Sequence, residues 1–281
     1  MTEETKIKTR KGGLIGVVSI ILGAGGVFLS YLFIFLYLGK ILVAETAAAR
    51  ECRLVAPFFL PAFACVGIMG GILWLTAGVG FFQKKVWGYK VGVIAVVIAL
   101  FASFWPNIPT MESGVAVPGP WFLIFFPNLL VFFYLVKSRG QESWGKALLG
   151  LLVGMAFILE FINGIAATTR MVNRLPPLEP DFAPAMMYML TMPTNMIASI
   201  LLGYTAIGLF IGKKQNLVRI AGLAGVFLAI SAGFPLAIYS MFFTGDGPGF
   251  SMFLMGPVVS LVVGVVFLSS KMMNKIMHNT E

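Results

Sequence analysis

Residues 80–92 read GFFQKKVWGYKVG, and residues 208–222 read GLFIGKKQNLVRIAG. Each stretch places a lysine pair between two apolar runs of helical length. Paired positions are offset by 129 to 130 residues, which indicates one membrane unit used twice. Two further motif pairs follow at this offset: FWPNIPTM (104–111) with FPLAIYSM (234–241), and VPGPWFLIFFP (117–127) with GPGFSMFLMGP (247–257).

The composition places the chain in lipid. Of its 281 residues, 59% are hydrophobic and only 11% are charged, whereas soluble domains have about 25% charged residues. A globular protein in water needs a polar surface. The low share of charged residues therefore indicates that lipid, which accepts apolar surface, surrounds the chain. The formal net charge of +9 is carried by short clusters between apolar runs. That placement is typical of membrane topology signals, and nucleic acid is not an expected partner.

Eight apolar runs are each long enough to cross a bilayer, which takes about 20 helical residues for about 30 Å of hydrocarbon. The sequence therefore predicts an all-α integral membrane protein with eight transmembrane helices and no separate soluble domain. The runs are residues 14–39, 57–82, 90–106, 119–136, 146–168, 184–211, 219–243 and 251–270.

A four-helix unit begins and ends on the same side of the membrane, so its duplicate inserts in the same orientation. We therefore expect two tandem parallel four-helix repeats, related by an axis along the membrane normal. Pro127 and Pro257 occupy matched positions and are expected to kink the fourth helix of each repeat. The predicted segments are a basic tail (1–13), repeat 1 (14–136), a connector (137–145), repeat 2 (146–270) and a second tail (271–281).

The positions of lysine and arginine predict the topology. Fifteen of the twenty lie in the two tails and in the connectors near 83–90, 137–146 and 212–219. Cytoplasmic loops are enriched in these residues, so we expect both termini, both tails and the 137–145 connector to be cytoplasmic. The expected location is the plasma membrane, with several crossings and with membrane lipids as partners.

Small residues at helical spacing predict how the helices pack. Gly67 and Gly71 lie four residues apart, as do Gly150 and Gly154, and Gly23 falls in the first apolar run. In lipid there is little hydrophobic drive between helices, so glycines favour association by allowing close backbone approach. We interpret these glycines as helix-packing positions.

Glu160 is the one charged residue that we place inside a predicted membrane helix. The nearest cation in sequence, Arg170, is ten residues away, which is about 15 Å at helical rise. A bare carboxylate in hydrocarbon is costly, so Glu160 should be protonated, hydrogen-bonded or next to water. Two interpretations are open. Together with Asn163 on the same helix face, Glu160 carries a proton or binds a substrate; alternatively, it is a neutral acid bonded to a neighbouring helix.

The predicted helix 184–211 contains Pro193, Thr194 and Asn195. Proline lacks the N–H donor that the helix needs, so we expect a break near mid-membrane that frees backbone carbonyls. Such breaks form binding sites in transporters, which makes Thr194 and Asn195 candidates for a substrate site. Proline kinks also occur in membrane helices without any ligand.

Four arginines lie on the predicted outer side, where cations are otherwise scarce. One interpretation is that they hold lipid phosphates or the acidic surface of a partner. The alternative is local pairing with acids in the same loops, such as Glu51. The four are Arg50, Arg53, Arg170 and Arg174.

The sequence predicts no catalytic, metal or cofactor site. His278, the sole histidine, lies in the C-terminal tail, and the two cysteines are Cys52 and Cys65. No nucleophile–histidine–acid set and no zinc, haem or iron–sulfur ligand set can be assembled from them. An enzyme is therefore not expected.

Two function classes remain. The first is a non-enzymatic subunit or scaffold of a membrane assembly, whose partners are other membrane subunits or further copies of the chain. The second is a small secondary transporter or channel. Its site would lie between the two repeats and use Glu160 and the broken helix 184–211.

Overall fold

The computed structural model describes residues 12–174, 182–212, 215–243, 251–269, 272–273 and 276. Every regular element within these residues is helical, which confirms the all-α prediction. Among these residues, six helices are long and apolar enough to cross a membrane, so the chain is a polytopic helical membrane protein. It divides into two compact units, Met1–Glu142 (unit 1) and Ser143–Glu281 (unit 2).

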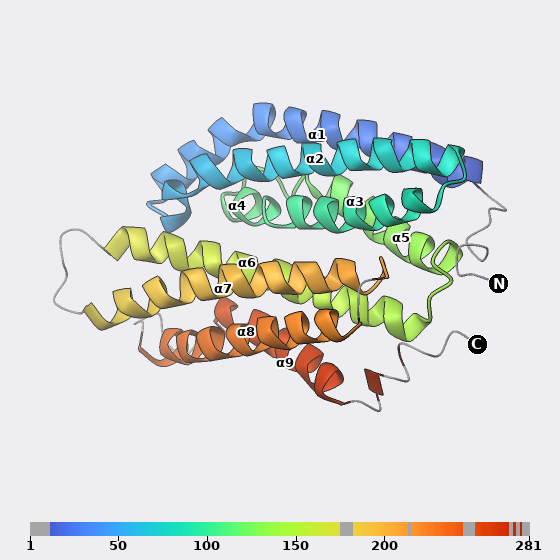
Figure 1. Ribbon diagram of the computed structural model, residues 1–281. Helices are drawn as coiled ribbons and strands as arrows, with labels where there is room; N and C mark the ends of the chain where they lie inside the picture. The colour runs from blue at the N-terminus through green and yellow to red at the C-terminus, as the bar shows by residue number, and fades with distance from the viewer. Residues whose placement is uncertain are drawn as a thin grey trace. The chain divides into compact units, whose positions relative to one another are not determined.

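Unit 1 is a bundle of four long helices. Figure 1 shows α1 and α2 running side by side; α2 also packs on α3, α3 on α5, and α5 contacts α1 to close the bundle. Its elements are α1 (Gly12–Ala47), η2 (Glu51–Leu54), α2 (Ala56–Phe82), α3 (Val86–Phe104), α4 (Asn107–Glu112) and α5 (Phe122–Ser138).

Unit 2 repeats this order of packing. The first long helix packs on the second, the second on the third and the third on the fourth, which returns to contact the first. Its elements are α6 (Trp144–Arg174), α7 (Phe182–Gly208), α8 (Gln215–Phe243), η3 (Met252–Leu254) and α9 (Met255–Leu268).

Two helices extend beyond their predicted ends. The run predicted to end at 39 continues as α1 to Ala47, and the run predicted to end at 168 continues as α6 to Arg174. Both extensions carry polar residues in their last turns. Because α1 extends to Ala47, Glu45 lies in a helix and not in the predicted outer loop 40–56.

Two of the eight predicted crossings form shorter apolar helices, Phe122–Ser138 and Met255–Leu268. Their 17 and 14 residues span about 25 Å and about 21 Å at 1.5 Å per residue, less than a hydrocarbon layer of about 30 Å. Pro127 lies inside α5, but Pro257 lies in the first turn of α9, so the predicted matched kink in the second helix was wrong. In a first turn, proline removes an N–H that has no helical acceptor.

The predicted break at Pro193 was also wrong. α7 is a single α-helix from Phe182 to Gly208 with Pro193 inside it. In the next position, the hydroxyl of Thr194 donates to the carbonyl oxygen of Leu190 at 2.7 Å. This hydroxyl is satisfied within its own helix and needs no ligand, and proline is tolerated inside membrane helices.

The close contact between α1 and α2 depends on glycines seven residues apart. A Cβ on Gly23 would lie 2.8 Å from the carbonyl oxygen of Gly71, and a Cβ on Gly71 would lie 2.8 Å from that of Gly23. One heptad away, a Cβ on Gly78 would lie 3.3 Å from the carbonyl oxygen of Gly16. The two backbones therefore meet along a glycine seam, as predicted for Gly23 and Gly71. Gly154 was expected to pack similarly, but a Cβ there meets no described atom within 4 Å.

Hydroxyl side chains within the helices are mostly satisfied locally. They donate to a carbonyl oxygen one turn earlier in the same helix, so they need neither water nor a ligand. Examples are Ser19 to Ile15, Ser103 to Ala99, Thr169 to Ile165 and Thr205 to Leu201.

Parts of the predicted repeat and topology signals lie outside the described residues. These are the tail up to residue 11, Lys213-Lys214, Pro248-Gly249 and His278.

Candidate functional site

Glu160 lies on the face of α6 that packs against α9, and its side chain has no exposed surface. The hydroxyl of Ser260 on α9 donates to Glu160 Oε1 at 3.2 Å. Asn163, one turn along α6, donates from Nδ2 to the carbonyl oxygen of Phe253 at 3.3 Å. The carboxyl group therefore joins α6 to the last helix of unit 2.

Gly256 lets α9 approach this carboxyl group. A Cβ at position 256 would lie 2.6 Å from Glu160 Oε1 and 2.7 Å from Asn163 Nδ2. Real Cβ atoms do not come this close, so the backbone of α9 lies directly on the polar pair because residue 256 has no side chain. Gly256 and Ser260 are one helical turn apart and present a small, partly polar surface to Glu160.

Some buried polar atoms in unit 2 lack hydrogen-bond partners among the described residues. They are Oε2 of Glu160 and both side-chain atoms of Asn195 on α7. α6 and α7 pack against each other, and the hydroxyl of Ser199 donates to the carbonyl oxygen of Phe157 at 3.0 Å. An unpaired buried polar atom costs about 1–3 kcal/mol. Unit 2 therefore retains hydrogen-bonding capacity that a proton, a water molecule or a small solute would satisfy.

The four predicted site residues of unit 2 are only partly brought together. Glu160 and Asn163 lie one turn apart on the face of α6 that packs against α9, as their spacing on one helix predicts. Asn195 is fully buried on α7. Thr194 is half-buried and bonded to its own helix, so it does not join the polar pair.

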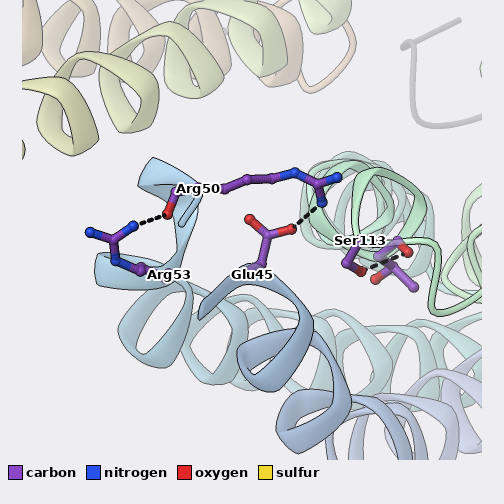
Figure 2. Close-up of polar contacts among 5 residues, drawn as sticks. Glu45, Arg50, Arg53 and Ser113 are labelled. Atoms are coloured by element: carbon purple, nitrogen blue, oxygen red, sulfur yellow. Dashed lines mark hydrogen bonds and ion pairs between the residues drawn. The ribbon is translucent and has the colours of Figure 1, made fainter. Parts of the chain in front are cut away.

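Two of the predicted outer arginines have partners close in sequence. Figure 2 shows Arg50 reaching Glu45, with its Nη1 3.0 Å from Glu45 Oε1. Arg53 Nη1 donates to the carbonyl oxygen of Arg50 at 3.3 Å. Local pairing is therefore found for Arg50, with Glu45 as its partner, and the side chain of Glu51 lies outside the described residues. Glu45 has no exposed side-chain surface and its Oε2 has no described partner, so Arg50 supplies its counter-charge.

The other two arginines belong to α6. The guanidinium carbon of Arg170 lies 4.7 Å from the ring centroid of Phe253, a cation–π distance. The side chain of Arg174 lies outside the described residues. Phe253 also accepts from Asn163, so the segment before α9 is held to α6 at two points.

Cys52 lies beside the Glu45–Arg50 pair in the short helix η2. Burial, followed by the negative charges of Glu45 and Glu112, raises the pKa of its thiol to about 12, and Arg50 opposes the shift. Burial and the negative charges of Glu45 and Glu112 each disfavour the thiolate form. Cys52 is therefore a protonated, unreactive thiol at neutral pH.

Sequence analysis missed Glu45 and Ser260 as partners in these contacts. Glu45 lies outside the apolar run from which the end of α1 was predicted. Ser260 is one of many small polar residues in the apolar runs, and which helix it faces depends on tertiary packing.

Among the described residues, no group of three or more His, Cys, Asp or Glu side chains is placed to hold a metal ion. Comparison with protein families, curated proteins and solved structures gave no match.

Proposed function

We propose that the chain is a non-enzymatic subunit or scaffold of a membrane assembly. The observation that carries this proposal is the structural use of Glu160. An acid inside a membrane helix is by default a functional candidate, but here Ser260 bonds to it and the backbone at Gly256 packs directly on it. This is the arrangement of a neutral acid that links two helices.

The proposal extends to topology. Eight crossings, two tandem parallel four-helix repeats and cytoplasmic termini are consistent with the same order of helix packing in both units. The charge distribution supports cytoplasmic placement of the connector between Ser138 and Trp144. The plasma membrane is the proposed location.

The exterior of α1 supports contact with lipid or with helices of other subunits. Phe28, Tyr31 and Phe35 are 64%, 64% and 85% exposed and share one helix face. A Cβ on Gly25, one turn before Phe28, meets no described atom within 4 Å. A large apolar face with a shallow glycine position suits acyl chains or another membrane helix.

Gentle extraction from native membranes followed by mass spectrometry tests this proposal. We expect a stoichiometric membrane partner, or a homo-oligomer of more than two copies, to remain bound in mild detergent. Recovery of a monomer or a simple homodimer alone would contradict the subunit proposal and favour transport.

Transport is the second candidate, because Glu160 Oε2 and the Asn195 amide are buried without described partners. In this alternative, Glu160 carries a proton inside unit 2 and Asn195 binds a polar group of the solute. The test uses proteoliposomes with a trapped pH-sensitive dye and an imposed pH gradient. Faster proton entry than in protein-free liposomes, lost in Glu160→Gln with thermal stability retained, would establish transport. Equal proton entry into protein-containing and protein-free liposomes would remove this candidate.

A further inference from the structure

Arg139 is a buried cation at the end of α5. Its side chain is 8% exposed, and no described residue accepts a hydrogen bond from its Nη2 atom. Its guanidinium carbon lies over the ring of Phe81 of α2, 5.7 Å from the ring centroid. A guanidinium group has five N–H donors around its edge, so stacking on a ring satisfies none of them.

A second buried donor lies at the same end of unit 1. Tyr89 of α3 is 5% exposed, and its hydroxyl has no described hydrogen-bond partner. The hydroxyl lies against Gly140, the residue directly after Arg139, where any Cβ would collide with it. Gly140 thus allows α3 and the end of α5 to approach closely. Two helices therefore bring a guanidinium group and a hydroxyl group, each with unused donors, to one end of the bundle.

Three exposed lysines lie at this end of unit 1. Lys84 and Lys85 in the turn between α2 and α3, and Lys90 in the first turns of α3, are all exposed. The acid facing this site is Glu142, whose charge acts on the Tyr89 hydroxyl. Gln141 in the following connector is exposed, so the donors lie near the surface end of the bundle and not at its middle.

We infer that Arg139 and Tyr89 form a binding site for a phosphate group at the basic end of unit 1. Phosphate oxygens accept from a guanidinium group in bidentate geometry and from a tyrosine hydroxyl, which matches the two unused donors. Basic pockets between membrane helices near the cytoplasmic surface bind anionic lipid headgroups in this way. The exposed lysines attract the same anion. The site is independent of the proposed function, because it fits a scaffold or a transporter.

The test measures binding of short-chain phosphatidic acid to the full-length protein in neutral detergent, by native mass spectrometry and thermal shift. We expect one tightly held lipid in the wild type. Arg139→Gln should weaken binding at least about tenfold, because a charge-assisted bidentate contact is lost. Lys85→Gln is the matched control: it removes the same charge from an exposed position and should change affinity less than about twofold. Glu142→Gln should strengthen binding, because it removes the facing negative charge.

Equal losses in Arg139→Gln and Lys85→Gln would show only diffuse charge attraction and would overturn the site. If Arg139→Gln does not fold, Tyr89→Phe decides, since it keeps the ring and removes one donor. We expect it to weaken binding severalfold, and unchanged affinity would overturn the proposal. A parallel titration with inorganic phosphate distinguishes the source. Stabilisation by lipid alone identifies a headgroup, stabilisation by both identifies phosphate in general, and stabilisation by neither overturns the proposal.

Discussion

Trp74 on α2 donates from its indole nitrogen to Asn128 Oδ1 on α5 at 2.7 Å, and both side chains are buried. In unit 2, Ser260 on α9 donates to Glu160 on α6. Each unit thus ties its last apolar helix, α5 or α9, to an earlier helix through a buried side-chain hydrogen bond. Since apolar side chains pack with little selectivity among lipid-embedded helices, such bonds help to specify which helices pair.

Replacing Asn128 should destabilise unit 1. Asn128→Leu leaves the Trp74 N–H buried without an acceptor, at an expected cost of about 1–3 kcal/mol. Thermal unfolding in detergent measures the loss. The double variant Trp74→Phe with Asn128→Leu should be more stable than the sum of the single effects predicts. Strict additivity would mean that the bond does not contribute.

Gly256→Ala should destabilise unit 2, because the new methyl group would lie 2.6 Å from Glu160 Oε1. Overpacking of this kind costs about 1–3 kcal/mol. Gly154→Ala is the control, since its methyl group would meet no described atom within 4 Å. Thermal unfolding should separate the two variants, and equal melting temperatures would contradict the close approach of α9 to Glu160.

The glycine seam predicts contrasting effects at two neighbouring positions of α1. Gly23→Ala forces α1 away from Gly71 and should lower the melting temperature by several degrees. Gly25→Ala, two residues later, enters open space and should leave the melting temperature unchanged or slightly higher. If Gly25→Ala were the more damaging change, the packing face of α1 would be different from the one described.

Removing Arg50 should leave the buried Glu45 carboxylate without its counter-charge. Because Arg50 itself is 42% exposed, we expect Arg50→Ala to cost about 1–2 kcal/mol, less than the 3–5 kcal/mol of a fully buried pair. Adding Glu45→Gln should recover most of that loss in thermal unfolding. Arg53→Ala, which loses one exposed backbone hydrogen bond, should have little effect.

Cys52 should react slowly with alkylating reagents, because burial and the nearby acids raise its thiol pKa to about 12. At pH 8 its thiolate fraction, and hence its rate with iodoacetamide, should be roughly a thousandfold below that of a free thiol. The rate should keep rising between pH 8 and 10, where ordinary thiols level off. Glu45→Gln should lower the pKa and speed the reaction.

The measurement uses a Cys65→Ala background, so that the alkylated residue is Cys52 in every case. Unfolded protein in denaturant supplies the reference rate. If the folded protein matched that reference at pH 8, Cys52 would be open to solvent and free of the influence of Glu45 and Glu112.

Hydropathy predicted the helical class, and glycine spacing predicted that Gly23 and Gly71 are helix-packing positions, because both depend on local sequence. That these two glycines meet each other depends on tertiary packing. Helix ends were less predictable. α1 continues past its apolar run to Ala47, since its backbone groups are better satisfied in a helix than in a loop. Pro193 illustrates the same preference: the helix absorbs one missing donor and does not break.

The partners of Glu160 could be foreseen only in part. Asn163 follows from helical spacing, but Ser260 lies one hundred residues away and comes into contact only when α9 packs on α6. Arg139 was counted among the charges that set topology. Its burial depends on the positions of Phe81 and Tyr89, which no local pattern reveals.

The glycine seam has a consequence for biogenesis. Both of its sides come from residues before Phe82, so α1 and α2 can associate as a hairpin before α3 has been synthesised. The seam is the stretch in which the backbones of α1 and α2 touch directly, which makes this hairpin a natural nucleus on which α3 and α5 assemble.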